Sequence, residues 1–326
     1  KGVEFGDRAA LAALLEERDA ARLSLEAQPS VVGKNAPRDV LSPIDGAVVG
    51  QVIEMDVDGA RAMMAIAASG FPQWNATPVE TRAQKLERAA DLIEAQRGAF
   101  IALLQSEAGK TLDDALAEVR EAADMCRYYA SGARRIGNEV RLPGPTGEDN
   151  RLRYSGRGVF ICISPWNFPL AIFMGQVVAA LVTGNAAVAK PAEQTPLIAA
   201  LAVSLLYEAG VPRDALQLAP GAGDVGAALV ADPRAAGVVF TGSVEVARHI
   251  NQSLAARAGA IAPLIAETGG INAMIVDSTA LIEQVVDDVL ASAFRSAGQR
   301  CSALRLLCLQ EDIAPTAIET LIGATK

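Results

Sequence analysis

The sequence predicts an α/β protein whose central part is a doubly wound parallel sheet. After about residue 150 it contains short apolar runs rich in β-branched residues, and helical stretches separate most of them. Strands that are apolar on both faces and alternate with helices are typical of a parallel sheet that helices cover on both sides. The runs are GVFICI, AAVAK, ALQLAP, GVVFTG and APLIAE. A further strand at 272–277 and a helix near 279–297 continue this pattern toward Cys301.

The part before residue 150 is expected to be mainly helical. Residues 7–27 have helical spacing and predict a connecting helix, and two apolar runs around Asp45-Gly46 indicate a hairpin. From about residue 56 to 137 the pattern predicts consecutive amphipathic helices. The helix that follows Pro78 places on one face Leu86, Ala89, Ala90 and Ile93.

Composition excludes several classes of protein. The 326-residue chain is 51% hydrophobic and carries a net charge of −9. This composition is typical of an ordinary globular protein, and the length predicts about two domains. Nucleic-acid-binding proteins usually present a basic surface, so we expect no nucleic-acid partner for this segment. No apolar run reaches the roughly 18 residues of a membrane span, and the N-terminus lacks a secretory signal pattern.

Cysteine and histidine usage predicts neither a zinc site nor disulfides. Cys126, Cys162, Cys301 and Cys308 form no CxxC pair, and His249 is the single histidine. We therefore expect no metal site, and we interpret His249 as a surface residue of a helix. Four scattered thiols in a chain of this length favour a reducing, cytoplasmic location.

Two segments are candidates for binding a dinucleotide phosphate. GAGDVG (221–226), which contains Gly223, fits G-x-G-x-x-G, with Glu245 near the offset of a ribose-binding acid. That acid should end a second strand, whereas Glu245 is expected in the first turn of a helix, so glycine turns are the alternative. In FTGSVEVA, Gly242 and Ser243 open a helix whose N–H groups and dipole suit a pyrophosphate. Ordinary N-capping by Ser243 is the alternative there.

Other polar residues are expected at strand ends, where ligands of such sheets bind. Asn167 in SPWNFPL lies between aromatic residues, and a preorganised amide donor suits an oxyanion; bonding to the loop backbone is the alternative. Lys190 and Glu193 could bond sugar hydroxyls, or could form a surface ion pair. Glu267 ends an apolar strand, where a raised pKa would suit a general base; a solvated acid at a turn is the alternative.

Cys301 has two opposed interpretations: it could be a small buried residue or a nucleophile. A nucleophilic cysteine usually has a histidine partner, and His249 is distant in sequence. On the predicted helix 111–137, Glu121, Met125 and Tyr128 share a face that could line a cavity or could only pack.

Five motifs give these residues a common interpretation. SPWNFPL, AKPAEQTP, FTGSVEVA, ETGG and GQRCSA occur in the order and spacing of the aldehyde dehydrogenase superfamily, which the chain resembles over about residues 30–326. The resemblance implies the aldehyde dehydrogenase fold, with a Rossmann-like NAD-binding domain at 31–268 that includes the N-terminal helices. Residues 269–326 would be the first part of an α/β catalytic domain, and 1–30 a linker from an upstream domain.

Residue roles follow from the same resemblance. It implies that Cys301 is the nucleophile, Glu267 the general base and Asn167 the side-chain donor to the oxyanion. The implied cofactor contacts are Ser164, Pro165, Trp166, Lys190, Glu193, Gly223, Thr241, Gly242, Ser243, Thr268 and Gly269. Substrate contacts are expected from Arg300, Ser302 and Glu121. We expect NAD rather than NADP, because the Glu193 carboxylate can accept bonds from a ribose 2′-OH and would repel a 2′-phosphate.

One branch of the superfamily is more similar still. FRSAGQRCSALR, PWNFPLAIF and AETGGINAMIVDS resemble the L-glutamate-γ-semialdehyde dehydrogenase domain of bacterial proline utilization A. This implies oxidation of L-glutamate-γ-semialdehyde to L-glutamate, an FAD-dependent proline dehydrogenase domain upstream, and a homo-oligomer. Thr268 stands where much of the superfamily has leucine. The alternatives are another small aldehyde, a CoA-acylating or acyl-phosphate-forming relative, and a non-catalytic relative of the fold.

The ends of the chain are expected to be internal. The chain starts at Lys1 without methionine and stops at Lys326 inside an apparent helix. We interpret it as a piece of a longer polypeptide whose remaining catalytic and oligomerisation segments follow. A protein that truly ended at Lys326 would be expected to be inactive.

Overall fold

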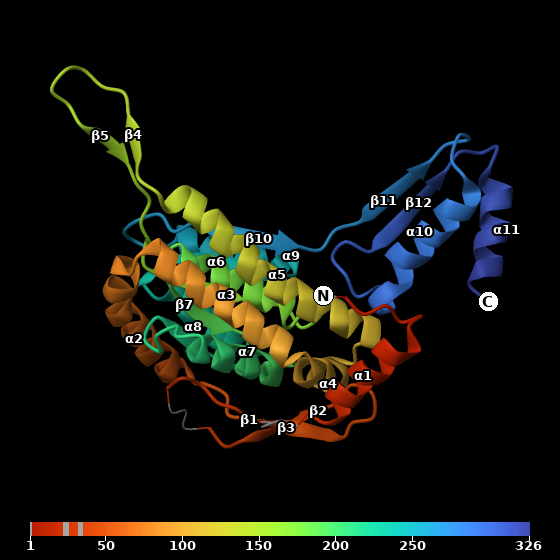
Figure 1. Cartoon of the computed structure of the whole chain (residues 1–326), viewed down its shortest axis with the longest axis horizontal. Coiled ribbons are helices and arrows are strands. Elements are labelled where there is room, and N and C mark those ends of the chain that lie inside the picture. The colour runs from red at the N-terminus through yellow and green to blue at the C-terminus, as the bar shows by residue number, and fades with distance from the viewer. Residues whose placement is uncertain (1, 22–25, 32–34) are drawn as a thin grey trace. The chain divides into compact units, whose positions relative to one another are not determined.

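In the computed structural model, which describes residues 2–21, 26–31 and 35–326, the main sheet is built around β6 (Val159–Ile163) (Figure 1). The strand order is β10-β9-β6-β7-β8. β6 pairs in parallel with β7 (Ala186–Lys190) and with β9 (Ala235–Gly242). The edge strands are β8 (Leu216–Leu218) and β10 (Leu264–Thr268). The chain therefore builds one side of β6 first and then crosses to the other, which creates a switch point beside β6.

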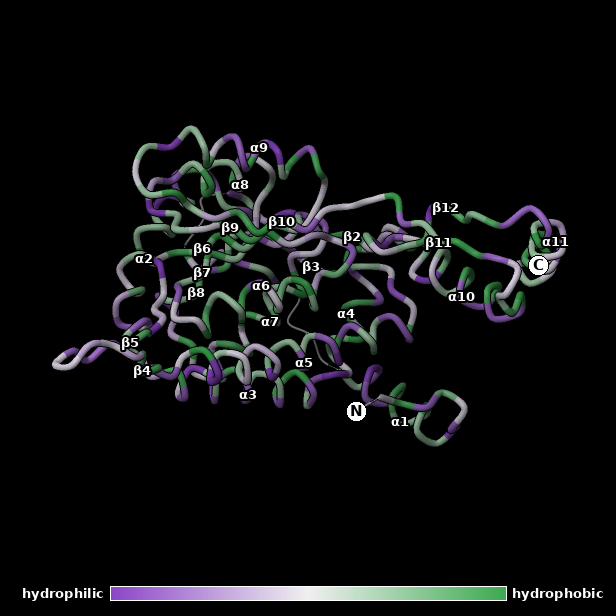
Figure 2. The backbone as a smooth tube through the Cα atoms, turned by 90° about the horizontal axis from the view of Figure 1, so that it is seen from above, coloured by the Kyte–Doolittle hydropathy of each residue, from purple (hydrophilic) through white to green (hydrophobic). Residues whose placement is uncertain are grey.

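Helices cover both faces of this sheet. Alternate residues of β6 enter two different cores: Phe160 and Cys162 join one, and Val159 and Ile161 join the other. The first core contains α6 (Ala171–Val182) and α7 (Pro196–Glu208), and the second contains α8 (Gly223–Ala231), α9 (Val244–Ala255) and part of α2 (Val57–Ala76). Figure 2 shows the central strands as a hydrophobic band. The predicted doubly wound α/β fold is confirmed.

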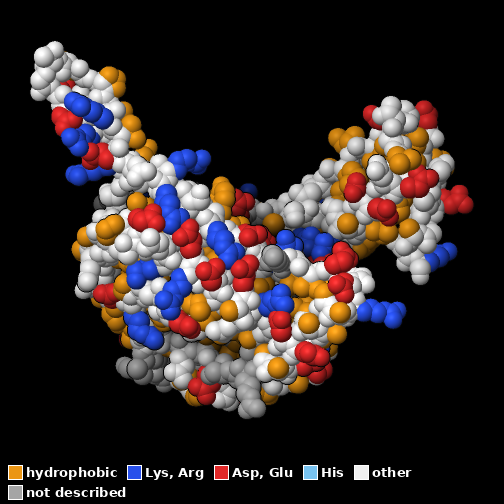
Figure 3. Space-filling view, in the orientation of Figure 1, with side chains coloured by type: hydrophobic (Ala, Val, Ile, Leu, Met, Phe, Trp, Pro, Cys, Tyr) orange, Lys and Arg blue, Asp and Glu red, His pale blue; other side chains and the backbone are white. Residues whose placement is uncertain are grey.

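The predicted succession of N-terminal helices is also confirmed. After α2 come α3 (Val79–Ala95), α4 (Arg97–Ala108) and α5 (Leu112–Gly137). The predicted face of α3 is fully buried, because its four apolar residues lie in the first core. On the solvent side, Arg134 of α5 pairs with two glutamates of α3, and the face in Figure 3 accordingly shows interspersed acidic and basic side chains. These helices are thus part of the same core as the sheet.

The N-terminal segment corrects one prediction. The helix expected at 7–27 is shorter: α1 (Arg8–Asp19) starts at the N-cap Asp7, whose carboxylate accepts from Ala9 N and Ala10 N. Residues 22–25 of that range lie outside the described residues. Beyond them, β1 (Glu26–Ala27) pairs in parallel with β3 (Val48–Val52). Pairing with a distant strand therefore overrides the local helical spacing.

Two hairpins flank the helices. β2 (Arg38–Leu41) pairs antiparallel with β3, as the sequence predicts, and Gly46 in their turn has φ +74°. β4 (Val140–Leu142) and β5 (Asn150–Leu152) form a second antiparallel pair, which the sequence interpretation missed. In Figure 1 this second hairpin extends away from the neighbouring helix α5.

The chain divides into two compact units, Lys1–Ala266 and Glu267–Lys326. In the second unit, β11 (Asn272–Val276) pairs in parallel with β12 (Leu304–Leu309). α10 (Ile282–Phe294), a 3₁₀ turn (Arg295–Gly298) and α11 (Ala314–Ala324) complete it. This confirms the strand and helix expected before Cys301. In the described parts of both units, every helix is too short or too polar to cross a bilayer.

Candidate functional site

A hollow of about 330 Å³ opens at the carboxyl ends of the central strands. Ile163 and Lys190 are the last residues of β6 and β7, and α8 and α9 supply the opposite walls. Its lining is mostly apolar, with a few polar groups, as in binding sites for small organic ligands. The lining residues are Ile163, Lys190, Glu193, Gly223, Gly226, Ala227, Val230, Val246, His249, Ile250 and Ser253. The structure therefore brings together three predicted cofactor residues, Lys190, Glu193 and Gly223.

Lys190 is buried in this hollow, with 6% of the residue exposed. Its Nζ donates to the main-chain oxygen of Pro191 at 3.2 Å, and burial lowers its pKa although the charges of Glu193, Glu54 and Asp224 oppose that shift. A Cβ at Gly226 would lie 3.3 Å from Lys190 Cδ, so only glycine leaves the lysine stem its full space. The surface-ion-pair alternative is wrong for Lys190, because its side chain is not on the surface.

The start of α9 shows how its serine is used. Ser243 is the N-cap of α9, and its Oγ accepts a hydrogen bond from Val246 N at 3.2 Å. The capping alternative is therefore confirmed, and the pyrophosphate role of Gly242 and Ser243 stays a prediction. Glu245 lies in the first turn of this helix, as expected, and not at a strand end. The G-x-G-x-x-G segment consequently lacks the acid of the dinucleotide fingerprint.

The loop after β6 carries the predicted oxyanion donor. Ser164 N donates to Lys190 O at 3.2 Å, which ties this loop to the end of β7. Ser164 Oγ is buried and has no hydrogen-bond partner among the described residues. Trp166 is 46% exposed, and Pro165 and Asn167 are half-buried. Thr241 accepts from Gln176 Nε2 at 3.0 Å, and the same amide nitrogen donates to Ile163 O.

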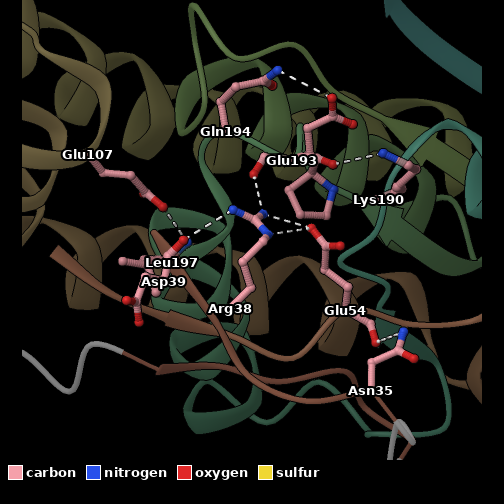
Figure 4. Close-up of polar contacts among 10 residues, drawn as sticks. Asn35, Arg38, Asp39, Glu54, Glu107, Lys190, Glu193, Gln194 and Leu197 are labelled. Carbon is pink, nitrogen blue, oxygen red and sulfur yellow. Dashed lines mark hydrogen bonds and ion pairs between the residues drawn. The ribbon is translucent and has the colours of Figure 1, made fainter. Parts of the chain in front are cut away.

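Arg38 is a residue at this site that the sequence interpretation missed. Its guanidinium reaches from β2 to the carboxylate of Glu54, with Nη2 and Oε1 2.7 Å apart, and to the main-chain oxygen of Glu193 at 3.1 Å (Figure 4). Asn35 Nδ2 donates to the main-chain oxygen of Glu54 at 3.0 Å. No motif signals this contact, because it joins segments far apart in the sequence. His249 was also missed: it is exposed on α9, as expected, yet it lines the hollow.

The α5 face that contains Glu121 is hollowed. Glu121, Met125 and Tyr128 line an open depression of about 500 Å³, which confirms the cavity-lining alternative for these residues. Tyr128 is largely exposed and packs edge-to-face against Tyr129, with ring centroids 5.2 Å apart. A substrate role for Glu121 stays a prediction.

Glu267 lies near the end of β10 with its side chain exposed. The solvated-acid alternative therefore describes this side chain. Thr268 is half-buried and Gly269 is exposed. The general-base role thus stands on the motif alone.

Cys301 is exposed, so the buried-spacer alternative is wrong. Asn272 Nδ2 donates to the main-chain oxygens of Cys301 at 2.7 Å and of Ala303 at 3.0 Å, which fixes the backbone around the thiol. Arg305 Nη2 donates to Gly298 O at 2.7 Å, so this arginine anchors the loop before the thiol. Ser302 is exposed and Arg300 is half-buried.

The other thiols differ in exposure. Cys126 and Cys162 are buried, and burial raises the pKa of each to about 12, whereas Cys308 is exposed. Within residues 2–21, 26–31 and 35–326, no three histidine, cysteine or acidic side chains gather as metal ligands would.

Comparison with known proteins identifies the family. Residues 31–326 match the model of the aldehyde dehydrogenase family. The chain belongs to this family. It is 52% identical over 303 residues to the bifunctional protein PutA of Klebsiella aerogenes, covering 91% of this chain and 22% of that protein. It is 39% identical over 287 residues to the 1-pyrroline-5-carboxylate dehydrogenase of Anoxybacillus flavithermus, covering 86% and 55%.

Solved structures of other members of the family have the same fold as this chain. A crystal structure of a proline utilization A mutant from Bradyrhizobium japonicum superposes with a TM-score of 0.89 at 57% identity, covering 99% of this chain and 30% of that chain. A 1-pyrroline-5-carboxylate dehydrogenase from Thermus with bound NAD gives a TM-score of 0.94 at 32% identity, covering 99% and 65%. The chain therefore spans only part of the length of these family members.

Proposed function

We propose that this chain is the aldehyde-oxidising part of an NAD-dependent L-glutamate-γ-semialdehyde dehydrogenase of proline catabolism. The observation that carries the proposal is the hollow at the strand ends, which gathers Lys190 and Glu193 in a member of the aldehyde dehydrogenase family. The names of the relatives support the substrate, because 1-pyrroline-5-carboxylate is the cyclic imine of this aldehyde. An upstream proline dehydrogenase domain belongs to the same proposal, and the relatives named as bifunctional proteins support it. Assembly into a homo-oligomer is proposed from the resemblance alone.

The residues of the hollow fit the adenosine end of NAD. Apolar side chains of α8 and α9 offer two walls for a flat base, and Gly226 leaves room beside them. Lys190 and Glu193 supply one donor and one acceptor for ribose hydroxyls. Ser164 Oγ, buried and without a hydrogen-bond partner in the described part of the chain, offers a further polar atom in the adjoining loop. The Glu193 carboxylate favours NAD over NADP by repulsion of a 2′-phosphate.

The proposed chemistry uses three residues of the chain. The Cys301 thiolate adds to the aldehyde carbon, and Asn167 Nδ2 with the Cys301 N–H would stabilise the resulting oxyanion. NAD supplies the hydride acceptor. Loss of hydride leaves an acyl thioester on Cys301. Glu267 then takes a proton from the water that attacks this thioester, which releases the acid and restores the thiol.

Production of NADH tests the proposal. The protein that contains this chain, in its natural length, is mixed with NAD and L-glutamate-γ-semialdehyde, and absorbance of NADH is followed. We expect turnover, and none from Cys301→Ala, whereas Cys308→Ala, which removes the other exposed thiol, should retain it. NADH formation only in the presence of CoA would favour the CoA-acylating alternative. No NADH with this aldehyde would contradict the proposal.

A further inference from the structure

A buried ion pair lies directly behind the loop that carries Asn167. Lys110 occupies the turn between α4 and α5, and Glu118 lies two turns into α5. Lys110 Nζ and Glu118 Oε2 are 3.0 Å apart, with side-chain exposures of 5% and 1%. Both ends of the lysine turn are fixed: Gly109 ends α4 with φ +65°, and Thr111 caps α5 by accepting from Asp114 N. The pair is therefore held on a rigid helical frame.

Both charged groups contact the segment that follows Asn167. Glu118 Oε1 accepts hydrogen bonds from Leu170 N at 2.8 Å and Ala171 N at 3.2 Å, the first N–H groups of α6. Leu170, the N-cap of α6, provides no side-chain cap of its own, so the carboxylate from α5 replaces it. Lys110 Nζ lies 4.2 Å from the centroid of the Phe168 ring, within the range of a cation–π contact.

Burial makes this arrangement costly. It raises the pKa of Glu118, and the Lys110 charge and the two main-chain N–H groups act in the opposite direction. An apolar pair of similar volume is often as stable as a buried ion pair, so stability alone does not account for these charges. An apolar pair would supply neither the acceptor for the N–H groups of Leu170 and Ala171 nor the cation beside the Phe168 ring.

We propose that Lys110 and Glu118 are positioning residues for Asn167, whose loop they hold from the residue after it to the start of α6. This inference rests on the proposed function, in which Asn167 binds the oxyanion. Small displacements of a group that stabilises a transition state lower kcat strongly.

The chain contains a matched control. Glu107 of α4 is also buried, and its two carboxylate oxygens accept from Leu197 N at 2.7 Å and Ile198 N at 2.9 Å at the start of α7. Thr195, the N-cap of α7, makes no side-chain cap bond either. Glu107→Gln therefore perturbs an equivalent helix start, but at a loop that does not carry Asn167.

Tryptophan quenching reports on the loop independently of activity. Of the two tryptophans in this chain Trp74 is buried, so in the natural-length protein the acrylamide quenching that is lost in a Trp166→Phe reference reports on Trp166 beside Asn167. Lys110→Met/Glu118→Gln removes both charges, avoids an unpaired buried ion and keeps an oxygen for the main-chain donors. We expect stronger quenching of Trp166 in this double variant, near wild-type quenching in Lys110→Arg, and no change in Glu107→Gln.

Kinetics of the natural-length protein complete the test. We expect the double variant to lower kcat by about tenfold and to raise the KM for NAD by a smaller factor, because Ser164 to Trp166 precede Asn167 in the same loop. Lys110→Arg should retain most of kcat. Wild-type quenching and kcat in the double variant would overturn the inference. The inference would also be overturned if Glu107→Gln changed the quenching as much as the double variant does, relative to the loss of thermal stability in each. A wild-type protein without activity would instead contradict the proposed function, and the quenching result would still decide whether the pair orders the loop.

Discussion

Arg38 donates a hydrogen bond from Nη2 to the main-chain oxygen of Glu193 at 3.1 Å, across 155 positions of sequence. The same nitrogen lies 2.7 Å from Glu54 Oε1, so the guanidinium joins the N-terminal hairpin to the loop at the end of β7. The hairpin thereby helps to place the carboxylate that we propose for the adenosine ribose.

Arg38→Ala is therefore expected to weaken NAD binding. Loss of one hydrogen bond, worth about 1 kcal/mol, corresponds to an increase of about fivefold in the Kd for NAD, measured by calorimetry. Arg61→Ala removes a cation of an exposed pair with Asp58 and serves as the control, with an unchanged Kd. Equal Kd values for wild type and Arg38→Ala would show that the contact does not position the loop.

Glu193→Gln should reduce discrimination against NADP. Removing the carboxylate removes repulsion of a 2′-phosphate, and we expect the ratio of kcat/KM for NAD to that for NADP to fall by about tenfold, or ~1.4 kcal/mol. Glu245→Gln is the control, because the structure places that acid in the first turn of α9 and not at a strand end. A ratio that changed with Glu245 instead would revive the glycine-motif interpretation.

Glu267→Gln should separate the two halves of the reaction. Thiol addition and hydride loss should still give a burst of NADH, whereas steady-state turnover should fall by at least about 100-fold, since the water loses its base. Stopped-flow absorbance measures both phases. Glu283→Gln, in the first turn of α10, is a control that should turn over normally. Unimpaired steady-state turnover in Glu267→Gln would refute the assignment.

Thiol accessibility should divide the cysteines into two classes. Cys301 and Cys308 are exposed, whereas Cys126 and Cys162 are buried with pKa values that burial raises to about 12. An aromatic disulfide reagent should label the first two rapidly and the other two only after unfolding. Cys301→Ser should remove one fast-reacting thiol. A native protein with a single fast thiol, unchanged by Cys301→Ser, would show that Cys301 is covered in solution.

Glu107 should make folding stability depend on pH. Burial raises its pKa from 4.5 to about 8, although the N–H groups of Leu197 and Ile198 oppose the shift. The folded state therefore binds the proton more tightly than the unfolded state. The stabilisation is complete below pH 4.5 and is lost as the pH rises toward 8, by up to ~1.4 kcal/mol per pH unit.

Urea unfolding from pH 5 to 8 measures this effect. The free energy of unfolding of Glu107→Gln should fall less steeply with pH than that of the wild type, because the amide does not titrate. Glu4→Gln, at an exposed position, should follow the wild-type slope. Parallel slopes for wild type and Glu107→Gln would contradict the raised pKa.

The periodic features of the sequence were sufficient to predict the strands of the main sheet, the helices α2 to α5 and the buried face of α3, but not β4, β5 or β12. They failed for residues 26–27, because pairing with β3 depends on a strand more than twenty positions away. They also could not reveal the burial of Lys190 or the contacts of Arg38. These depend on which segments meet in three dimensions, and a lysine at a strand end has the same local pattern whether or not helices cover it.

In the candidate site too, local features could be predicted from the sequence, whereas features that depend on tertiary packing could not. The motifs named the hollow-lining residues Lys190, Glu193 and Gly223, because strand ends and helix starts are readable locally. Glu107 and Glu118 appeared as ordinary charged residues of amphipathic helices. Their burial follows from the packing of α4 and α5 against α7 and α6, which no spacing rule encodes.

The shared core has a consequence for modularity. The sequence changes near residue 150 from a helical pattern to alternating strands and helices, which suggests a domain boundary at which the parallel sheet could be separated. Excision at that point would strip two helix starts of the carboxylates that complete them and would open the apolar side of α6 to solvent. Recombination or domain grafting should therefore succeed only when the helices α2 to α5 are transferred together with the sheet.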